Sequence, residues 1–143
     1  MNIGTRPPTP APFEGIDLPG FTLTSSTLTD GAPMPEVATA RGGSLSPDLA
    51  WEGFPEGTAS FILTCFDPDA PIPSGWWHWA ILDIPVSMTH LDEGAGASDL
   101  ALDGPAFHLR GDAGEASYFG AAPPVGDRPH RYIFTVHALD VDT

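Results

Sequence analysis

The chain has 143 residues, 41% of them apolar, which is enough for one domain with a buried core. Nineteen acidic residues stand against five arginines and no lysine, so the formal net charge is −14. Such a charge disfavours nucleic acid and anionic membrane surfaces as partners. The sequence has neither a leader-like apolar region nor an apolar stretch of membrane-spanning length. We therefore expect a cytoplasmic chain without integral membrane association.

The first 19 residues are rich in proline and poor in apolar side chains. Proline favours extended backbone, and chain ends with few apolar groups are often poorly ordered. We predict an extended or poorly ordered lead-in over residues 1–19 and a single domain over residues 20–143.

Two apolar runs, residues 60–66 and 77–84, alternate with a period of two and predict strands. Both faces of each run are largely apolar, so both strands are expected in the interior of a sheet. In the second run, the alternation puts Trp77 and Trp79 on the face opposite His78. About ten residues join the runs, so we expect them to pair in antiparallel fashion and to bring Asp67 close to His78.

Shorter strands are predicted near residues 21–26 and 49–51, and a last strand at 131–139. Residues 85–129 are predicted to be loop, with at most one turn of helix between 87 and 102. The 16 glycines and 17 prolines favour short strands and many turns. The predicted fold class is all-β, arranged as a sandwich.

The polar residues at the strand ends are expected to converge. Asp67 ends one strand, while His78 and His130 begin two others. All three can meet only if strand 131–139 runs antiparallel to strand 60–66. This direction is a requirement that the structure can test.

Four short motifs carry a resemblance to a known family. In order and spacing they resemble the phosphatidylethanolamine-binding protein family, most of all its bacterial and archaeal branch, often labelled Raf-kinase-inhibitor-like. The resemblance extends from about Phe21 to Asp140. The motifs are Ser46-Pro-Asp-Leu-Ala-Trp51, Asp67-Pro-Asp-Ala-Pro71, Gly75-Trp-Trp-His-Trp79, and Gly120-Ala-Ala-Pro-Pro-Val-Gly126 followed by His130-Arg-Tyr132.

The resemblance implies a prokaryotic protein with an antiparallel, Greek-key-like β-sandwich and little helix, in which a large sheet faces a smaller one. It also implies a small anion-binding cavity at one sheet end, and no cofactor. By motif position, the residues expected to line the cavity are Asp67, Asp69, Pro71, Trp76, His78, Ala122, Pro123, Pro124, His130 and Tyr132.

A phosphate-like group needs donors, which His78, His130 and the Tyr132 hydroxyl can supply together with backbone N–H groups. Asp67 and Asp69 alone would repel an anion. They are therefore expected to hold histidine rings or to contact a cationic head group. Because the two histidines titrate at about pH 6–7, binding is expected to strengthen as the pH falls.

Ordinary structural interpretations stay open beside this one. Asp-Pro-Asp is commonly a turn that bonds its own backbone, and His78 fits a packed core histidine. The segment from His130 to Tyr132 fits a plain strand start with Arg131 exposed. Two carboxylates and two imidazoles are suitable metal donors, but their spacing matches no compact metal motif, so we predict no metal.

The chain departs from the family pattern at three places. Ala121 and Ala122 stand in the turn where the family usually has other residues. Residues 108–112 replace an Asn-Asp-Phe-Gly-like run, and Arg110 there is a candidate anion contact. The family's C-terminal helix has no counterpart before Thr143. A missing helix would leave apolar surface exposed, so either a partner or a second copy of the chain covers it, or the sequence is cut short, or this branch of the family is naturally short.

Three function classes follow, in this order. The first is a binding module for phosphate-bearing groups, such as phosphoethanolamine-like head groups or phosphorylated residues. The second is an interaction protein that inhibits a kinase or a protease. The third is a hydrolase or isomerase that uses Asp67 and His130 as acid and base. Because no activated nucleophile or metal motif is evident, we do not expect an enzyme.

Overall fold

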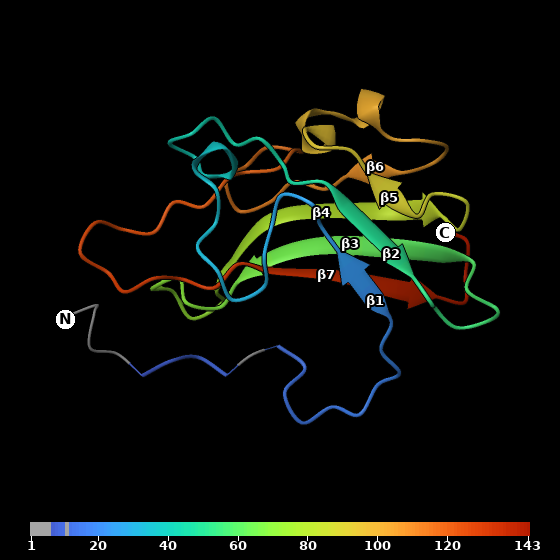
Figure 1. Cartoon of the computed structure of the whole chain (residues 1–143), viewed down its shortest axis with the longest axis horizontal. Helices are drawn as coiled ribbons and strands as arrows, with labels where there is room; N and C mark the ends of the chain where they lie inside the picture. The colour runs from blue at the N-terminus through green and yellow to red at the C-terminus, as the bar shows by residue number, and fades with distance from the viewer. Residues whose placement is uncertain (1–6, 11) are drawn as a thin grey trace.

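The computed structural model describes residues 7–10 and 12–143. Seven strands lie in this part of the chain: β1 (Thr22–Thr24), β2 (Leu49–Glu52), β3 (Ser60–Asp67), β4 (Trp76–Pro85), β5 (His90–Leu91), β6 (Phe107–His108) and β7 (Ile133–Leu139). They form a three-stranded sheet in the order β1-β2-β5 and a four-stranded sheet in the order β6-β4-β3-β7. The smaller sheet crosses one face of the larger one (Figure 1). The predicted all-β sandwich is confirmed.

The two predicted interior strands lie at the centre of the large sheet. β3 pairs with β4 on one side and with β7 on the other, and both pairings are antiparallel. The register sets Asp67 opposite Trp76 and Cys65 opposite Phe134. β7 therefore runs antiparallel to β3, as the convergence of Asp67, His78 and His130 requires.

A β-bulge in β4 changes the predicted alternation. Trp77 pairs with Phe66 and Trp79 pairs with Cys65, which leaves His78 as an extra residue between the two pairs. The bulge moves Trp77 to the outer face, where it is 43% exposed and its ring lies 4.4 Å from that of Phe66. Trp79 faces the core and is fully buried. The prediction that Trp77 and Trp79 share a face is wrong, because an alternating pattern contains no bulge.

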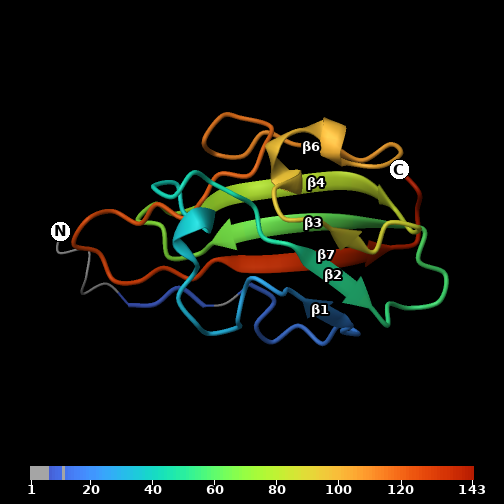
Figure 2. The ribbon, with the colours of Figure 1, turned by 45° about the horizontal axis from the view of Figure 1, so that its top comes forward.

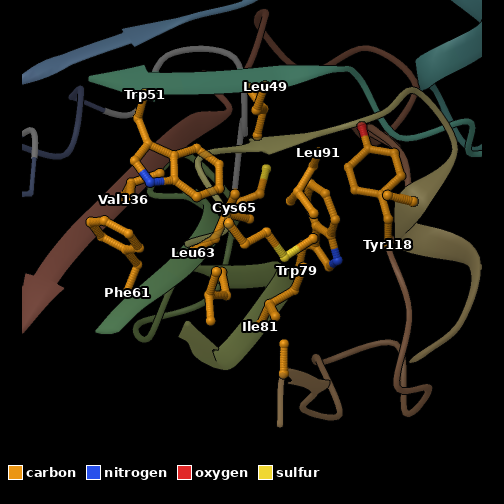
Figure 3. Close-up of a cluster of buried hydrophobic side chains, with 14 residues drawn as sticks. Leu49, Trp51, Phe61, Leu63, Cys65, Trp79, Ile81, Leu91, Tyr118 and Val136 are labelled. Carbon is orange, nitrogen blue, oxygen red and sulfur yellow. The ribbon is translucent and has the colours of Figure 1, made fainter. Parts of the chain in front are cut away.

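The core lies between the two sheets (Figure 3). The inward side chains of β3, which include Phe61 and Leu63, pack against Trp51 and Leu91 of the small sheet. Cys65 is fully buried in this cluster, and burial raises the pKa of its thiol well above the usual range. A buried thiol held in its neutral form is a poor nucleophile, as expected for this position.

The long segment between β4 and β7 holds more structure than predicted. It contains β5, β6 and two single turns of 3-10 helix, η3 (Ala95–Ala97) and η4 (Asp99–Ala101). A third such turn, η2 (Glu36–Ala38), precedes β2. Strands of two residues carry too short a period to be seen in a sequence pattern.

The described lead-in residues before Thr22 form no strand or helix. They are nevertheless packed on the domain: the Phe13 ring makes an edge contact with His137 of β7 at 5.4 Å. The prediction for residues 1–6 and 11 falls outside the described residues, and the division into lead-in and domain stays a prediction. No helix within residues 7–10 and 12–143 is long and apolar enough to cross a membrane.

Candidate functional site

The candidate site lies at the end of the large sheet where β3 stops and β4 and β7 start. Asp67 is the last residue of β3, opposite Trp76, the first residue of β4. Tyr132 directly precedes β7, which pairs with the other edge of β3. The bulge two residues into β4 turns His78 inward, and its side chain is buried. The predicted convergence of Asp67, Trp76, His78 and Tyr132 is thus observed.

His130 lies between two carboxylates. Its Nδ1 is 2.7 Å from Oδ2 of Asp67, and its Nε2 is 2.9 Å from Oδ2 of Asp127. The side chains of His130, Asp67 and Asp127 are 1%, 4% and 0% exposed. Both ring nitrogens donate to carboxylates when the ring is an imidazolium, and the cluster is then a buried cation between two anions.

This arrangement corrects the expected role of His130. The sequence predicted that His130 donates to an anion, but both of its N–H groups are engaged by carboxylates. The prediction that Asp67 holds a histidine ring agrees with the geometry. Asp127 was not foreseen, because in the sequence it is one more aspartate of a proline- and glycine-rich turn.

His78 is held in a different way. Its Nδ1 lies 2.7 Å from the Phe119 carbonyl oxygen, which can only accept, so Nδ1 carries a proton. Burial lowers the pKa of His78 below its usual value, and the bond to Phe119 and the charge of Asp67 oppose this only in part. The ring is therefore neutral at pH 7, with its lone pair on Nε2.

Two buried donors beside His78 have no hydrogen-bond acceptor in the part of the chain that the structure describes. They are Nε1 of Trp76 and the hydroxyl of Tyr132. The ring centres of Trp76 and Tyr132 lie 6.5 Å and 5.1 Å from that of His78. Burial raises the pKa of Tyr132 well above its usual value, so the hydroxyl keeps its proton. Buried polar atoms are seldom left unpaired, and a pair of such donors around one ring indicates a place for a ligand or an ordered water.

Asp69 holds arginines and not a histidine ring. Arg131 donates to it from Nε at 2.7 Å and from Nη2 at 3.0 Å, and its backbone N–H donates at 3.0 Å. Arg128 adds a bond from Nη2 at 3.0 Å. Burial alone would raise the pKa of Asp69, but these bonds and charges outweigh it and lower the pKa to about 2. The expectation that Asp69 holds a histidine is therefore wrong, and Arg131 is not a free surface residue.

The remaining predicted residues lie outside this cluster or at its rim. Pro71, Ala122, Pro123 and Pro124 are exposed in loops at this end of the sheet. Arg110 lines a groove on the outer face of the large sheet and donates to the Gly114 carbonyl at 2.8 Å. The structure therefore does not bring Arg110 to the site. Within residues 7–10 and 12–143, no group of three or more potential ligands is arranged to hold a metal ion.

Gly120 anchors the turn that leads from His78 toward the rim. Its N–H donates to Oγ of Ser44, and the neighbouring Ala121 carbonyl accepts from Ala40. A Cβ at residue 120 would lie 2.4 Å from the backbone carbon of Thr39, and backbone atoms cannot move aside as a side chain can. The turn therefore requires glycine for close backbone approach and not for an unusual φ.

We expect Gly120→Ala to lower the free energy of unfolding by about 3 kcal/mol, since it overpacks rigid backbone. Urea unfolding at pH 7 measures this, with Gly20→Ala as the control because a Cβ there meets no atom within 4 Å. Equal stabilities of the two variants would show that the backbone around Thr39 moves aside easily and that the close approach is not required.

The sandwich and its buried histidine–carboxylate end define a class of small all-β binding proteins, and comparison with known proteins places the chain within it. A family model described as phosphatidylethanolamine-binding protein matches residues 24–143. The chain is 45% identical over 125 residues to UPF0098 protein YbhB of Escherichia coli, across 84% of this chain and 78% of YbhB. It is 50% identical over 102 residues to UPF0098 protein YbcL of the same organism, across 71% of this chain and 56% of YbcL.

Solved structures agree with the sequence comparisons. The crystal structure of E. coli YbcL, described as a member of the mammalian PEBP family, superposes with a TM-score of 0.83 at 43% identity, over 86% of this chain and 79% of that chain. A PEBP homolog from Chlamydia trachomatis, CT736, gives a TM-score of 0.71 at 33% identity, over 85% of this chain and 76% of that one. The chain belongs to the phosphatidylethanolamine-binding protein family.

Proposed function

We propose that this chain is a binding module for small ligands that carry a phosphate group. The observation that carries the proposal is the pair of buried, unpartnered donors, Nε1 of Trp76 and the hydroxyl of Tyr132, beside the neutral ring of His78. The ionised oxygens of a phosphate group accept hydrogen bonds, so the two free donors of Trp76 and Tyr132 suit them.

The charged groups near His78 favour an anionic ligand more than the two aspartates of the motif, Asp67 and Asp69, suggest. Three carboxylates, Asp67, Asp69 and Asp127, are matched by three cations, Arg128, Arg131 and the His130 imidazolium. The formal charges of these six groups therefore cancel. From the sequence alone, Asp67 and Asp69 would repel an anion. In the structure cations lie against both carboxylates, so this repulsion is largely cancelled.

The protonation of His78 determines how many donors the site offers. The neutral ring has no proton on Nε2, whereas the protonated ring gains an Nε2–H donor and a positive charge. Because the pKa of His78 is lowered in the free protein, the ring acquires this extra donor and charge mostly at pH values below the usual histidine pKa. Anion binding should in turn raise that pKa, since linkage is reciprocal.

We expect the affinity for sulfate, measured by isothermal titration calorimetry, to rise about tenfold between pH 8 and pH 5.5, which is worth about 1.4 kcal/mol. Sulfate has no ionisation in this range, so the change reports the protein; phosphate and phosphoethanolamine then give the physiological comparison. In His78→Gln the pH dependence should vanish. An affinity that is the same at pH 5.5 and 8 in the native chain contradicts the assigned role of His78.

The other hypotheses make different predictions. We propose no catalytic role, since Asp67 and His130, the acid and base of the hydrolase hypothesis, are bonded to each other and His130 also to Asp127. Release of a product from a phosphoester would favour the enzyme hypothesis. A stoichiometric complex with a kinase or a protease would favour the inhibitor hypothesis. Cytoplasmic residence and a homodimer stay predictions that cell fractionation and light scattering can check.

A further inference from the structure

The proline-rich lead-in reaches the same end of the sheet as the candidate site. The Pro7 carbonyl accepts from Nη2 of Arg128 at 3.3 Å, and the Thr9 carbonyl accepts from Nη2 of Arg131 at 2.5 Å. These contacts join residues more than 120 positions apart in the chain. Figure 2 shows the N-terminal segment beside the loop that precedes β7.

The two guanidinium groups that hold the lead-in are the ones held by Asp69. Arg131 uses Nε and Nη2 for Asp69, and Arg128 uses Nη2. The buried carboxylate fixes the orientation of both groups, while the arginine side chains stay 20% and 41% exposed for Arg128 and Arg131. Two oriented guanidinium groups, partly open to solvent, form a preorganised site for oxygen acceptors.

The acceptors that the lead-in places on these groups, the carbonyls of Pro7 and Thr9, are neutral, whereas the carboxylates of Asp69 and Glu14 also act on Arg131. A main-chain carbonyl is a weaker partner for a guanidinium than an ionised phosphate oxygen, because only the phosphate adds an opposite charge and can bind the guanidinium through two oxygens. The Nη2 atoms that reach Pro7 and Thr9 also donate to Asp69. A phosphate oxygen at the same N–H groups must therefore replace the carbonyls of the lead-in.

A second anchor fixes the lead-in farther along the sheet. The Phe13 ring packs edge-on against His137, which pairs with Ile62 in the middle of β3, several residues away from Asp67. Pro10 and Pro12, which lie between the two anchors in the sequence, restrict the free chain and so reduce the entropy that docking removes. The described part of the lead-in therefore contacts the domain at two places, through the carbonyls of Pro7 and Thr9 and through the Phe13 ring.

We propose that Arg128 and Arg131 are a second recognition element of the anion site, and that the described lead-in residues 7–10, with Phe13 as their anchor, are a strap that competes with the ligand for them. The proposal rests on the phosphate-binding function proposed above. It adds a cationic contact for a second set of phosphate oxygens, and it makes release of the strap part of ligand binding. Tyr132 follows Arg131 directly, so the two elements adjoin.

The imidazole signals in NMR spectra test this with two reporters in one sample. His78 reports the anion site, and His137 reports the strap through the ring of Phe13. Phe13→Ala gives the His137 shift of the released state. On titration of the full chain with inorganic phosphate, and separately with phosphoethanolamine, both signals should move with one half-saturation concentration, and His137 should end at its Phe13→Ala position.

Two sets of variants test separately whether the strap and the two arginines affect the affinity for phosphate. Phe13→Ala should bind phosphate about threefold more tightly, because the competitor has lost an anchor. Arg128→Gln with Arg131→Gln should bind about tenfold more weakly and should show the released His137 shift without ligand. Arg110→Gln, an arginine on the outer face, is the matched control and should behave as the native chain does.

The outcomes separate the two proposals. If His78 responds while His137 keeps its shift, or if Phe13→Ala binds phosphate as the native chain does, the strap is overturned and the phosphate-binding function stands. If neither signal responds to phosphate or phosphoethanolamine, both proposals fail. The Phe13→Ala arm does not depend on the arginine variants folding, because Phe13 is 47% exposed and outside the core cluster.

Discussion

His130→Ala should lower the free energy of unfolding at pH 7 by about 3–5 kcal/mol, the range measured when one partner of a buried ion pair is removed. The variant leaves Asp67 and Asp127 facing each other in the protein interior without the cation between them. Most of the loss is the cost of the uncompensated carboxylates and not of the missing imidazole. Urea unfolding followed by circular dichroism gives the value.

His137→Ala is the matched control. His137 is a histidine of the same C-terminal segment and lies in β7, but it bonds no carboxylate in the described structure. It should cost clearly less than His130→Ala. Adding Asp127→Asn to His130→Ala should recover part of the loss, because one of the two unpaired charges is then gone. If His130→Ala costs no more than His137→Ala, or if Asp127→Asn deepens the loss, the buried charge cluster does not stabilise the fold as described.

Asp69→Asn should cost about 2 kcal/mol at pH 7, the free energy that corresponds to the lowering of the Asp69 pKa from 3.8 to about 2. The folded protein binds the proton more weakly than the unfolded chain does. The stabilisation is therefore fully present above pH 3.8 and is lost as the pH falls toward 2. The native chain and Asp69→Asn should differ most at neutral pH and converge in acid.

Unfolding in urea at pH 7, 5 and 3 measures this difference. Asp103→Asn, which removes an exposed carboxylate, is the control and should change stability by less than about 0.5 kcal/mol at each pH. A constant gap between Asp69→Asn and the native chain from pH 7 to pH 3 would mean that the arginine contacts do not set the ionisation of Asp69.

The parts of the fold that follow from chain periodicity could be predicted from the sequence. β3 and β7 alternate without interruption, so their faces and their antiparallel pairing follow from the pattern. The position of Asp67 at the end of one strand and of Tyr132 at the start of another then brings both to one sheet end. The family resemblance gave the same residues by an independent route, and the family is confirmed.

The sequence could not predict the parts that depend on contacts between distant segments. Trp77 and Trp79 lie on opposite faces because of a bulge at His78, which leaves no periodic trace. Asp127 and Arg128 look like ordinary turn residues until the fold brings them to His130 and Asp69. The contact of Arg131 with Thr9 joins the strand start to a segment that composition alone marks as loosely attached.

The most direct test of the central claim is the indole N–H signal of Trp76 in a ¹⁵N–¹H spectrum during a phosphate titration at pH 6. Trp76, Trp51 and Trp79 each hold a buried indole N–H without a partner, but only Trp76 lies at the candidate site. We expect the Trp76 signal to move downfield and saturate, while the signals of Trp51 and Trp79 stay in place. A Trp76 signal unchanged at millimolar phosphate, or equal shifts of all three, would contradict a phosphate site beside His78.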